Sequence, residues 1–172
     1  MPTDRKYLLD ANVFIEAKRR YYAFDLCPGY WECLVWYHNG ACIQSIDRVK
    51  EEIERGDDEL KDWVRAIMPG SCFASCDDAE VIEQYSQMQL WARQQGQFTE
   101  SAKAEFADKA DAWLIAHAKA KQFVLVTHKV LDRQIKKKIP MLNVCEAFDV
   151  PYVDTFAMLR DLEAQFNWRQ PT

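Results

Sequence analysis

Short apolar runs that alternate with long amphipathic stretches constrain the fold of this chain more than any other feature of its sequence. Residues 7–9 and 123–126 are continuous apolar runs, a pattern typical of strands buried on both faces of a sheet. Weaker strand candidates are residues 41–43, which end near Ser45, and residues 151–153. The apolar periodicity predicts helices over residues 30–38, 46–55, 58–67, 78–95, 108–121 and 155–167. Because strands and helices alternate, we expect an α/β fold with a parallel sheet.

Local signals refine this expectation. Asp77 and Glu80 have the spacing of a capping box at the start of the helix over residues 78–95. Residues 129–143 form the least regular part of the chain and contain a lysine triplet, which predicts an exposed loop. The length of 172 residues fits one domain of about 100–200 residues, so we expect residues 1–172 to form a single domain.

The composition argues against several classes of protein. Lys and Arg number 22 against 27 Asp and Glu, and the net charge of −5 argues against a protein that coats nucleic acid non-specifically. An enzyme with acidic metal ligands at its centre and a few basic residues around them is compatible with this charge. No run of about 18 apolar residues is present, so we expect neither a membrane span nor a signal peptide.

The cysteines indicate a reducing environment. None of the six lies in a secretory context, so we expect a cytoplasmic protein without a disulfide framework. Cys27, Cys33, His38 and Cys42 follow one another closely, but the tight C-x2-C spacing of a zinc knuckle is missing. We therefore favour buried thiols over a structural zinc ion at these positions.

Asp10 is the first candidate for a functional carboxylate. It directly follows the apolar run of residues 7–9, and Asn12 lies two residues later. Ligands of open parallel sheets bind beyond the carboxyl ends of the strands, which is where Asp10 falls. The alternative is that Asp10 only caps a helix that begins near Val13.

The helix over residues 108–121 carries a second candidate. At about 100° per residue, the apolar residues around Ile115 form one stripe, and Asp111 lies close to its middle. A carboxylate on the buried face is costly unless it is paired, so we expect Asp111 to meet a cation or several hydrogen-bond donors. Alternatively, Asp111 only interacts with the dipole of the first helical turn. Asp108 lies on the flank of the stripe, where it caps the helix or joins the site.

Glu52 is the acid of the helix over residues 46–55 that reaches inward. It lies roughly 90° from the centre of the apolar stripe, whereas Glu51 points away from that stripe. The alternative is an ordinary surface glutamate. If the strands next to these helices are neighbours, Asp10, Glu52 and Asp111 converge at one edge of the sheet. Clustered carboxylates bind hard divalent cations such as Mg2+ or Mn2+, which polarise a phosphodiester and activate water.

Three segments resemble the successive motifs of PIN-domain nucleases. They are YLLDANVFIE, SIDRVKEEIERG and ADAWLIAHAKA, the last followed by FVLVT. The similarity is closest to the VapC-like toxins and, more narrowly, to a PIN subfamily known as a domain of unknown function. It extends from Tyr7 to Val153 and implies a three-layer α/β/α sandwich around a central, mainly parallel sheet of about four to five strands.

The resemblance also implies an activity. The family's acidic ligands match Asp10, Glu52 and Asp111, and Asn12 matches the residue that supports the first acid. Family members hydrolyse RNA with Mg2+ or Mn2+ and leave a 5′-phosphate and a 3′-hydroxyl. We therefore expect a metal-dependent endoribonuclease that acts as the toxin of a toxin–antitoxin pair. RNA is then the substrate, an antitoxin is the protein partner, and a homodimer is the assembly.

Lys129 departs from the family's pattern. Many relatives carry a fourth acid at this position, two residues after the threonine that ends the strand, here Thr127. We hypothesise that the Lys129 ammonium stands where a second cation would sit and contacts the scissile phosphate, which leaves a one-metal enzyme. Asp108 or Asp132 is the alternative source of the missing carboxylate. We expect Thr127 and Lys129 to lie beside the metal, together with Asn12.

Other functions compete with this one. A degenerate nuclease domain that binds RNA or docks on a protein is suggested by Lys129 and by the aromatic helix over residues 30–38. A phosphotransferase of the haloacid dehalogenase type needs a second Asp where Asn12 stands, and neither a P-loop nor a Gly-rich dinucleotide turn is present. The histidines are scattered and are expected to be structural: His38, His117 and His128.

Overall fold

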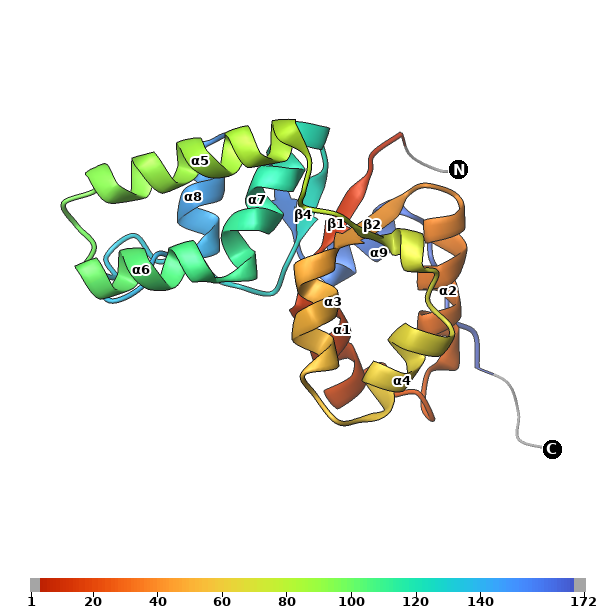
Figure 1. Cartoon of the computed structure of the whole chain (residues 1–172). Helices are drawn as coiled ribbons and strands as arrows, with labels where there is room; N and C mark the ends of the chain where they lie inside the picture. The colour runs from red at the N-terminus through yellow and green to blue at the C-terminus, as the bar shows by residue number, and fades with distance from the viewer. Residues whose placement is uncertain (1–3, 169–172) are drawn as a thin grey trace.

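One sheet of five parallel strands forms the centre of the computed structural model, which describes residues 4–168 (Figure 1). The order across the sheet is β3-β2-β1-β4-β5, and each neighbouring pair is parallel. The expected α/β fold with a parallel sheet is therefore confirmed. The strands are β1 (Tyr7–Leu9), β2 (Ile43–Ile46), β3 (Phe73–Ala74), β4 (Val124–Val126) and β5 (Tyr152–Val153).

Helices cover both faces of the sheet and complete a three-layer α/β/α sandwich. Figure 1 shows α1 to α4 grouped at one end of the molecule and α5 to α8 at the other. No helix within residues 4–168 combines the length and the apolar character needed to cross a membrane. The α-helices are α1 (Ala11–Arg19), α2 (Pro28–Asn39), α3 (Asp47–Glu54), α4 (Glu59–Ala66), α5 (Ala79–Gln94), α6 (Glu100–Asp108), α7 (Ala110–Lys121), α8 (Met141–Ala147) and α9 (Thr155–Asp161).

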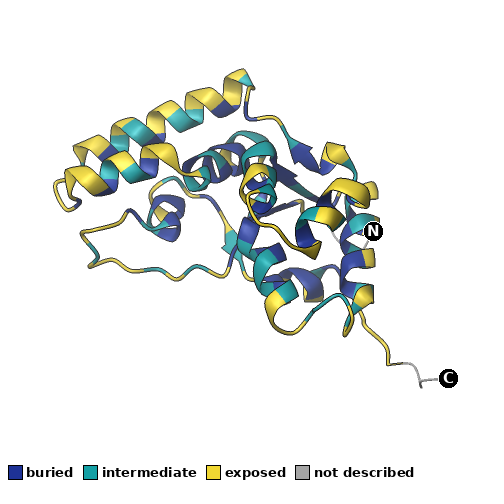
Figure 2. Ribbon diagram, turned by 60° about the horizontal axis from the view of Figure 1, so that its bottom comes forward, coloured by how far each residue is buried: buried dark blue, intermediate teal, exposed yellow. Residues whose placement is uncertain are grey.

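The hydrophobic core lies on the central strands. Leu8 and Leu9 of β1 and Leu125 of β4 are fully buried, and Figure 2 shows the strands enclosed by the helices. Full burial of an aliphatic side chain stabilises the fold by roughly 1.5–3 kcal/mol relative to its exposure. The carboxyl edge of β1 and β4 is therefore a rigid support for the polar residues that follow these strands.

Helices α5 and α6 extend beyond the sheet, and their outer sides are exposed (Figure 2). α5 packs along α7, where the rings of Tyr85 and Trp113 stack with their centroids 3.8 Å apart. α6 begins after Thr99, whose side-chain oxygen accepts the backbone N–H of Ala102. This packing places α6 on the same side of the molecule as the amino end of α7.

The helix predicted over residues 108–121 begins later than expected, at Ala110. Lys109 has an extended backbone, with φ −84° and ψ 154°, and separates α6 from α7. The position predicted for Asp108, on the flank of the stripe of one continuous helix, is therefore wrong. Asp108 instead ends α6.

Several elements differ from the sequence prediction. The helix predicted over residues 155–167 ends at Asp161, because Glu163 has the left-handed conformation that terminates helices, with φ 55°. The loop predicted over residues 129–143 ends early, because α8 begins at Met141. The two-residue strand β3 and the helix α6 were not predicted; neither carries a long apolar period.

The capping box predicted at the start of α5 is wrong by one residue. The N-cap residue is Asp78, whose Oδ1 accepts the backbone N–H groups of Glu80 and Val81. The backbone N–H of Asp77 instead donates to the Ser75 hydroxyl, so Asp77 belongs to the preceding turn.

All six cysteines are free thiols. Cys33 is partly buried on α2, and Cys42 is buried just before β2. The nearby ring of His38 bonds with the Ile43 carbonyl oxygen at 3.0 Å and with the Ser71 hydroxyl at 2.9 Å. These two bonds hold His38 in the packing of α2 against β2.

His117 of α7 is expected to make stability depend on pH. Its ring is buried, and its Nδ1 atom has no hydrogen-bond partner within residues 4–168. Burial lowers the pKa of this ring below the ordinary value, and the charge of Lys121 lowers it further. As the pH falls through about 6.5, His117 therefore becomes protonated in the unfolded chain but stays neutral in the folded chain. The free energy of unfolding is therefore unaffected by His117 above that pH, and it decreases as the pH falls from there towards the lower pKa of the folded state.

Thermal unfolding of wild type and His117→Leu at several pH values between about 7.5 and about 5 checks this expectation. The Tm of the wild type should fall by roughly 2–4 °C more than that of the variant over this range. Parallel curves for the two proteins would show that His117 does not contribute.

Candidate active site

The carboxyl ends of β1 and β4 lie at the topological switch point of the sheet. β2 pairs with one side of β1, whereas β4 pairs with the other side. A crevice opens at such a point in open parallel sheets, and ligands bind there. Asp10 directly follows β1 and Thr127 directly follows β4, so both residues lie at this edge of the sheet, where they are buried.

Asp10 is buried, with 2% of its surface exposed. Its Oδ2 atom accepts a hydrogen bond of 2.8 Å from the Thr127 hydroxyl. Asp10 occupies the N-cap position of α1, but its side chain makes no capping hydrogen bond, so the alternative of a simple helix cap is wrong. Burial raises the pKa of the Asp10 carboxyl above its ordinary value, and the positive charge of Lys129 opposes this rise.

Lys129 stands between Asp10 and Asp111. Its Nζ atom lies 2.6 Å from Asp111 Oδ1 and 3.8 Å from Asp10 Oδ2. Its backbone N–H donates to the Thr127 hydroxyl, which anchors the start of the segment after β4. Burial acts to lower the pKa of Lys129, but the neighbouring carboxylates raise it above its ordinary value. The ammonium is therefore charged at neutral pH.

Asp111 lies in the first turn of α7, and 20% of its side chain is exposed. Leu114 and Ile115 of the same helix are fully buried, as the apolar stripe predicts. The expectation that Asp111 meets a cation on this face is confirmed by its ion pair with Lys129. This pairing offsets the cost of removing the Asp111 carboxylate from water.

Glu52 approaches the same place from α3. Val49 and Ile53 are the buried side of this helix, and Glu52 lies next to it as an exposed residue. Partial burial raises the pKa of Glu52, and the charges of Asp10 and Asp111 raise it further. Glu52 is therefore near enough to Asp10 and Asp111 for their charges to act on it. The role of the three acids as metal ligands stays a prediction.

Asp108 and Asp132, the two alternatives for a fourth carboxylate, lie at the rim of the site. Asp108 is exposed at the end of α6. Oδ1 of Asp132 accepts the backbone N–H groups two and three residues further on, so this carboxylate shapes the turn after β4. The place between the two inner aspartates is held by Lys129 instead.

A large hollow of about 790 Å³ opens between α3, α6 and the segment after β4. Glu52 and Asp111 line it, and so does Lys129. Basic side chains also line this hollow, and side chains of this kind bind the phosphates of RNA. The basic residues are Arg48, Arg55, Lys109 and Lys138.

Arg48 is a candidate functional residue that the sequence pattern does not single out. Its guanidinium lies over the Trp113 ring, 4.5 Å from the centroid. Its Nε atom is buried and has no hydrogen-bond partner among the described residues. The available signal was its position one helical turn before Glu52, which puts both side chains on one side of α3.

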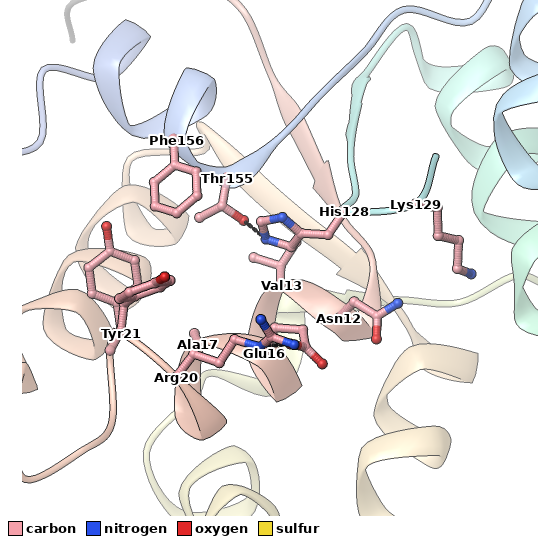
Figure 3. A pocket seen from close by; sticks show the side chains of 11 residues that line it. Asn12, Val13, Glu16, Ala17, Arg20, Tyr21, His128, Lys129, Thr155 and Phe156 are labelled. Atoms are coloured by element: carbon pink, nitrogen blue, oxygen red, sulfur yellow. Dashed lines mark hydrogen bonds and ion pairs between the residues drawn. The ribbon is translucent and has the colours of Figure 1, made fainter. Parts of the chain in front are cut away.

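A small hollow of about 430 Å³ lies beside α1 and the start of α9. Figure 3 shows Asn12 and Lys129 at one side of it and Phe156 at the other. Asn12 and Lys129 also line the large hollow. The two hollows therefore meet at Asn12 and Lys129, and Lys129 pairs with Asp10 and Asp111.

The donor chemistry of this site suits a hard divalent cation. Three carboxylates offer oxygen atoms alone, and together with the Lys129 ammonium they carry a formal charge of −2. Within residues 4–168, no three Asp, Glu, His or Cys side chains lie close enough to one another to ligate one ion as they stand. Charge and ligand type therefore fit Mg2+ or Mn2+, whereas the spacing of the acids does not fit as it stands, because the Lys129 ammonium lies between the two aspartates.

Comparison with known proteins assigns no activity to this site. A family described as Domain of unknown function (DUF4411) matches the chain over residues 7–166. This range begins with β1 and extends past α9, so the whole site lies within it. No curated protein matches the chain.

Proposed function

This chain belongs to the family Domain of unknown function (DUF4411). We propose that it is a metal-dependent endoribonuclease. The observation that carries the proposal is the cluster around Lys129 at the switch point of a parallel sheet: its ammonium pairs with Asp10 and Asp111, and Glu52 lines the same hollow as Asp111 and Lys129. The resemblance of the three sequence segments to PIN-domain motifs suggests the reaction, which is metal-dependent hydrolysis of RNA. Asp10 is a buried carboxyl with a raised pKa, and carboxyl groups with shifted pKa values are concentrated at functional sites.

The three acids would hold one Mg2+ or Mn2+. When bound, such an ion polarises the scissile phosphodiester and makes water acidic enough to attack it. The Thr127 hydroxyl keeps the Asp10 carboxylate in one orientation through its hydrogen bond. Asn12, at the junction of the two hollows, lies beside the same carboxylate in the chain and is proposed to support it.

Lys129 is proposed to take the place of a second metal ion. Its ammonium is charged and lines both hollows, so it can bind an oxygen of the scissile phosphate while Asp111 keeps it in position. The basic residues of the large hollow are proposed to hold neighbouring phosphates. Contacts of that kind weaken as the salt concentration rises, because bound counterions are released when RNA binds.

The biological role is proposed from the resemblance alone. By that resemblance, the protein is the toxin of a toxin–antitoxin pair that acts in the cytoplasm. A segment of the antitoxin would cover the carboxylate site, and the toxin would form a homodimer.

A second candidate function is a degenerate domain that binds RNA or a protein without cutting. One specific observation favours it: the Lys129 ammonium already neutralises part of the charge that a metal ion would neutralise. The aromatic helix α2 gives this candidate less support, because Tyr30, Trp31 and Tyr37 are buried core residues, although Trp36 is 58% exposed.

Cleavage of defined RNAs distinguishes the two candidates. Purified protein is incubated with single-stranded and hairpin RNAs, with Mn2+ or with EDTA, beside the variant Asp111→Asn. We expect cleavage that requires Mn2+ and that falls by at least about 100-fold in the variant, because the variant loses a ligand and the partner of Lys129. Asp57→Asn is the matched control, since the Asp57 side chain is fully exposed.

RNA binding without cleavage, unchanged between wild type and Asp111→Asn, would favour the degenerate domain. Cleavage that persists in EDTA would contradict the metal-dependent mechanism.

A further inference from the structure

The small hollow beside α1 and α9 is lined by none of the three acids, but Asn12 and Lys129 line both this hollow and the large one (Figure 3). Its volume of about 430 Å³ falls in the range of pockets that enclose organic ligands. Four side chains with flat rings line it: Tyr21, Tyr22, His128 and Phe156.

Two of these rings are exposed to solvent, and one of them, Phe156, also contacts the rings of Tyr22 and His128. Tyr21 is 73% exposed and Phe156 is 37% exposed. Large exposed aromatic side chains that gather around a hollow mark a binding surface, because each one presents an apolar face to water. Figure 3 shows Tyr21 and Phe156 on one side of the hollow, with His128 across from Tyr21.

The rings on the inner side of the hollow are held in fixed positions. His128 Nε2 and the Thr155 hydroxyl form a hydrogen bond of 2.7 Å, and the rings of His128 and Phe156 meet edge to face, 6.2 Å apart. Tyr22 stacks on the buried Tyr30 with a centroid distance of 4.5 Å. Rigid rings lose little conformational freedom when they bind, so this surface favours a flat aromatic ligand.

The remaining side of the hollow is polar and offers both kinds of hydrogen-bonding group. Glu16 of α1 and Arg20, which directly follows this helix, line it and form an ion pair with an N–O distance of 2.7 Å. A guanidinium donates hydrogen bonds and a carboxylate accepts them. A flat ring whose edge carries donors and acceptors matches this pair, and the nucleobases of RNA have that chemistry.

From these contacts we infer that the small hollow binds one unpaired nucleobase of the RNA substrate, next to the scissile phosphate. The inference rests on the proposed ribonuclease function. A base in this hollow directs its own phosphate towards Lys129, which lines both hollows. Bases within a duplex are stacked and paired, so the hollow selects a single-stranded segment or a loop.

The test measures binding without cleavage. Fluorescence anisotropy is recorded in EDTA with the Asp111→Asn protein, a short fluorescein-labelled single-stranded RNA, and matched RNAs that each lack one base. Loss of a stacked base costs roughly 1–3 kcal/mol, so one abasic position is expected to weaken binding by about 5-fold to 150-fold. Adding Phe156→Ala is expected to weaken binding of the intact RNA and to abolish the effect of that abasic position.

Two further variants make this test specific. Tyr21→Ala removes an exposed ring from the hollow and is expected to act like Phe156→Ala, with no effect on the Tm. Trp36→Ala removes an exposed ring of α2 that lies outside the hollow and is expected to leave binding unchanged. If the abasic effect persists in both hollow variants, the inference is overturned.

The outcomes also separate this inference from the proposed function. If wild type cuts RNA with Mn2+ and no abasic position affects binding, the base site is refuted and the ribonuclease stands. If the abasic effect is present and depends on Tyr21 and Phe156, but wild type cuts no RNA, the base site stands and hydrolysis is refuted.

Discussion

Replacement of Asp10 with Asn is expected to abolish RNA cleavage and, without metal, to raise the Tm. Activity is lost because the amide no longer offers a charged ligand oxygen at the centre of the site. Stability rises because burial disfavours the charged Asp10 carboxyl, and Asn removes that charge while it still accepts the Thr127 hydrogen bond. Relief of about 1 kcal/mol corresponds to roughly 2–4 °C in Tm.

Three measurements check this expectation. Cleavage is followed with Mn2+, the Tm is measured in EDTA, and growth is followed after expression in bacterial cells. Wild type is expected to arrest growth and Asp10→Asn to permit it, whereas Asp25→Asn, at an exposed turn, should behave as wild type in all three. Mn2+-dependent cleavage by Asp10→Asn would exclude Asp10 from the chemistry, and normal growth with wild type would count against a toxin.

Replacement of Lys129 with Glu is expected to lower the Tm in EDTA and to raise the number of bound Mn2+ ions per chain from one to two. The variant removes the cation between Asp10 and Asp111 and adds a fourth carboxylate to the same place. Breaking a mostly buried ion pair in this way costs roughly 3 kcal/mol, or about 6–12 °C in Tm. Saturating Mn2+ should restore most of this loss, because the ion binds the folded chain alone.

Isothermal titration with Mn2+ gives the stoichiometry, and thermal unfolding with and without Mn2+ gives the stability. Lys137→Glu makes the same change of charge at an exposed position of the segment after β4 and should alter neither quantity. Equal stoichiometry in wild type and Lys129→Glu would refute the idea that the ammonium replaces a second ion.

The inner acids are predictable from the sequence because each depends on a short-range pattern. The apolar run before Asp10 predicts a buried strand, and the carboxyl end of such a strand is where the residue lies. The helical period around Ile115 predicts that Asp111 faces inward, and its pairing with Lys129 agrees with that direction. Each conclusion depends only on where a residue lies within, or directly after, one helix or strand. Neither depends on how the helices and strands are arranged relative to one another.

Other features depend on tertiary packing and have no local signal. Lys129 reaches back to two aspartates from distant elements, which follows from the pairing of β1 with β4. Arg48 lies over Trp113 because α3 packs against α7. The break at Lys109 is marked by neither Gly nor Pro, so periodicity merges α6 with the next helix.

The junction of the two hollows at Asn12 and Lys129 determines how a polymer can approach the acids. An RNA strand can lie across the two hollows, with nucleotides continuing on either side of the bond that is cut. No terminus has to enter a blind tunnel. The architecture therefore suits incision within the length of a strand, and trimming from its ends is not required.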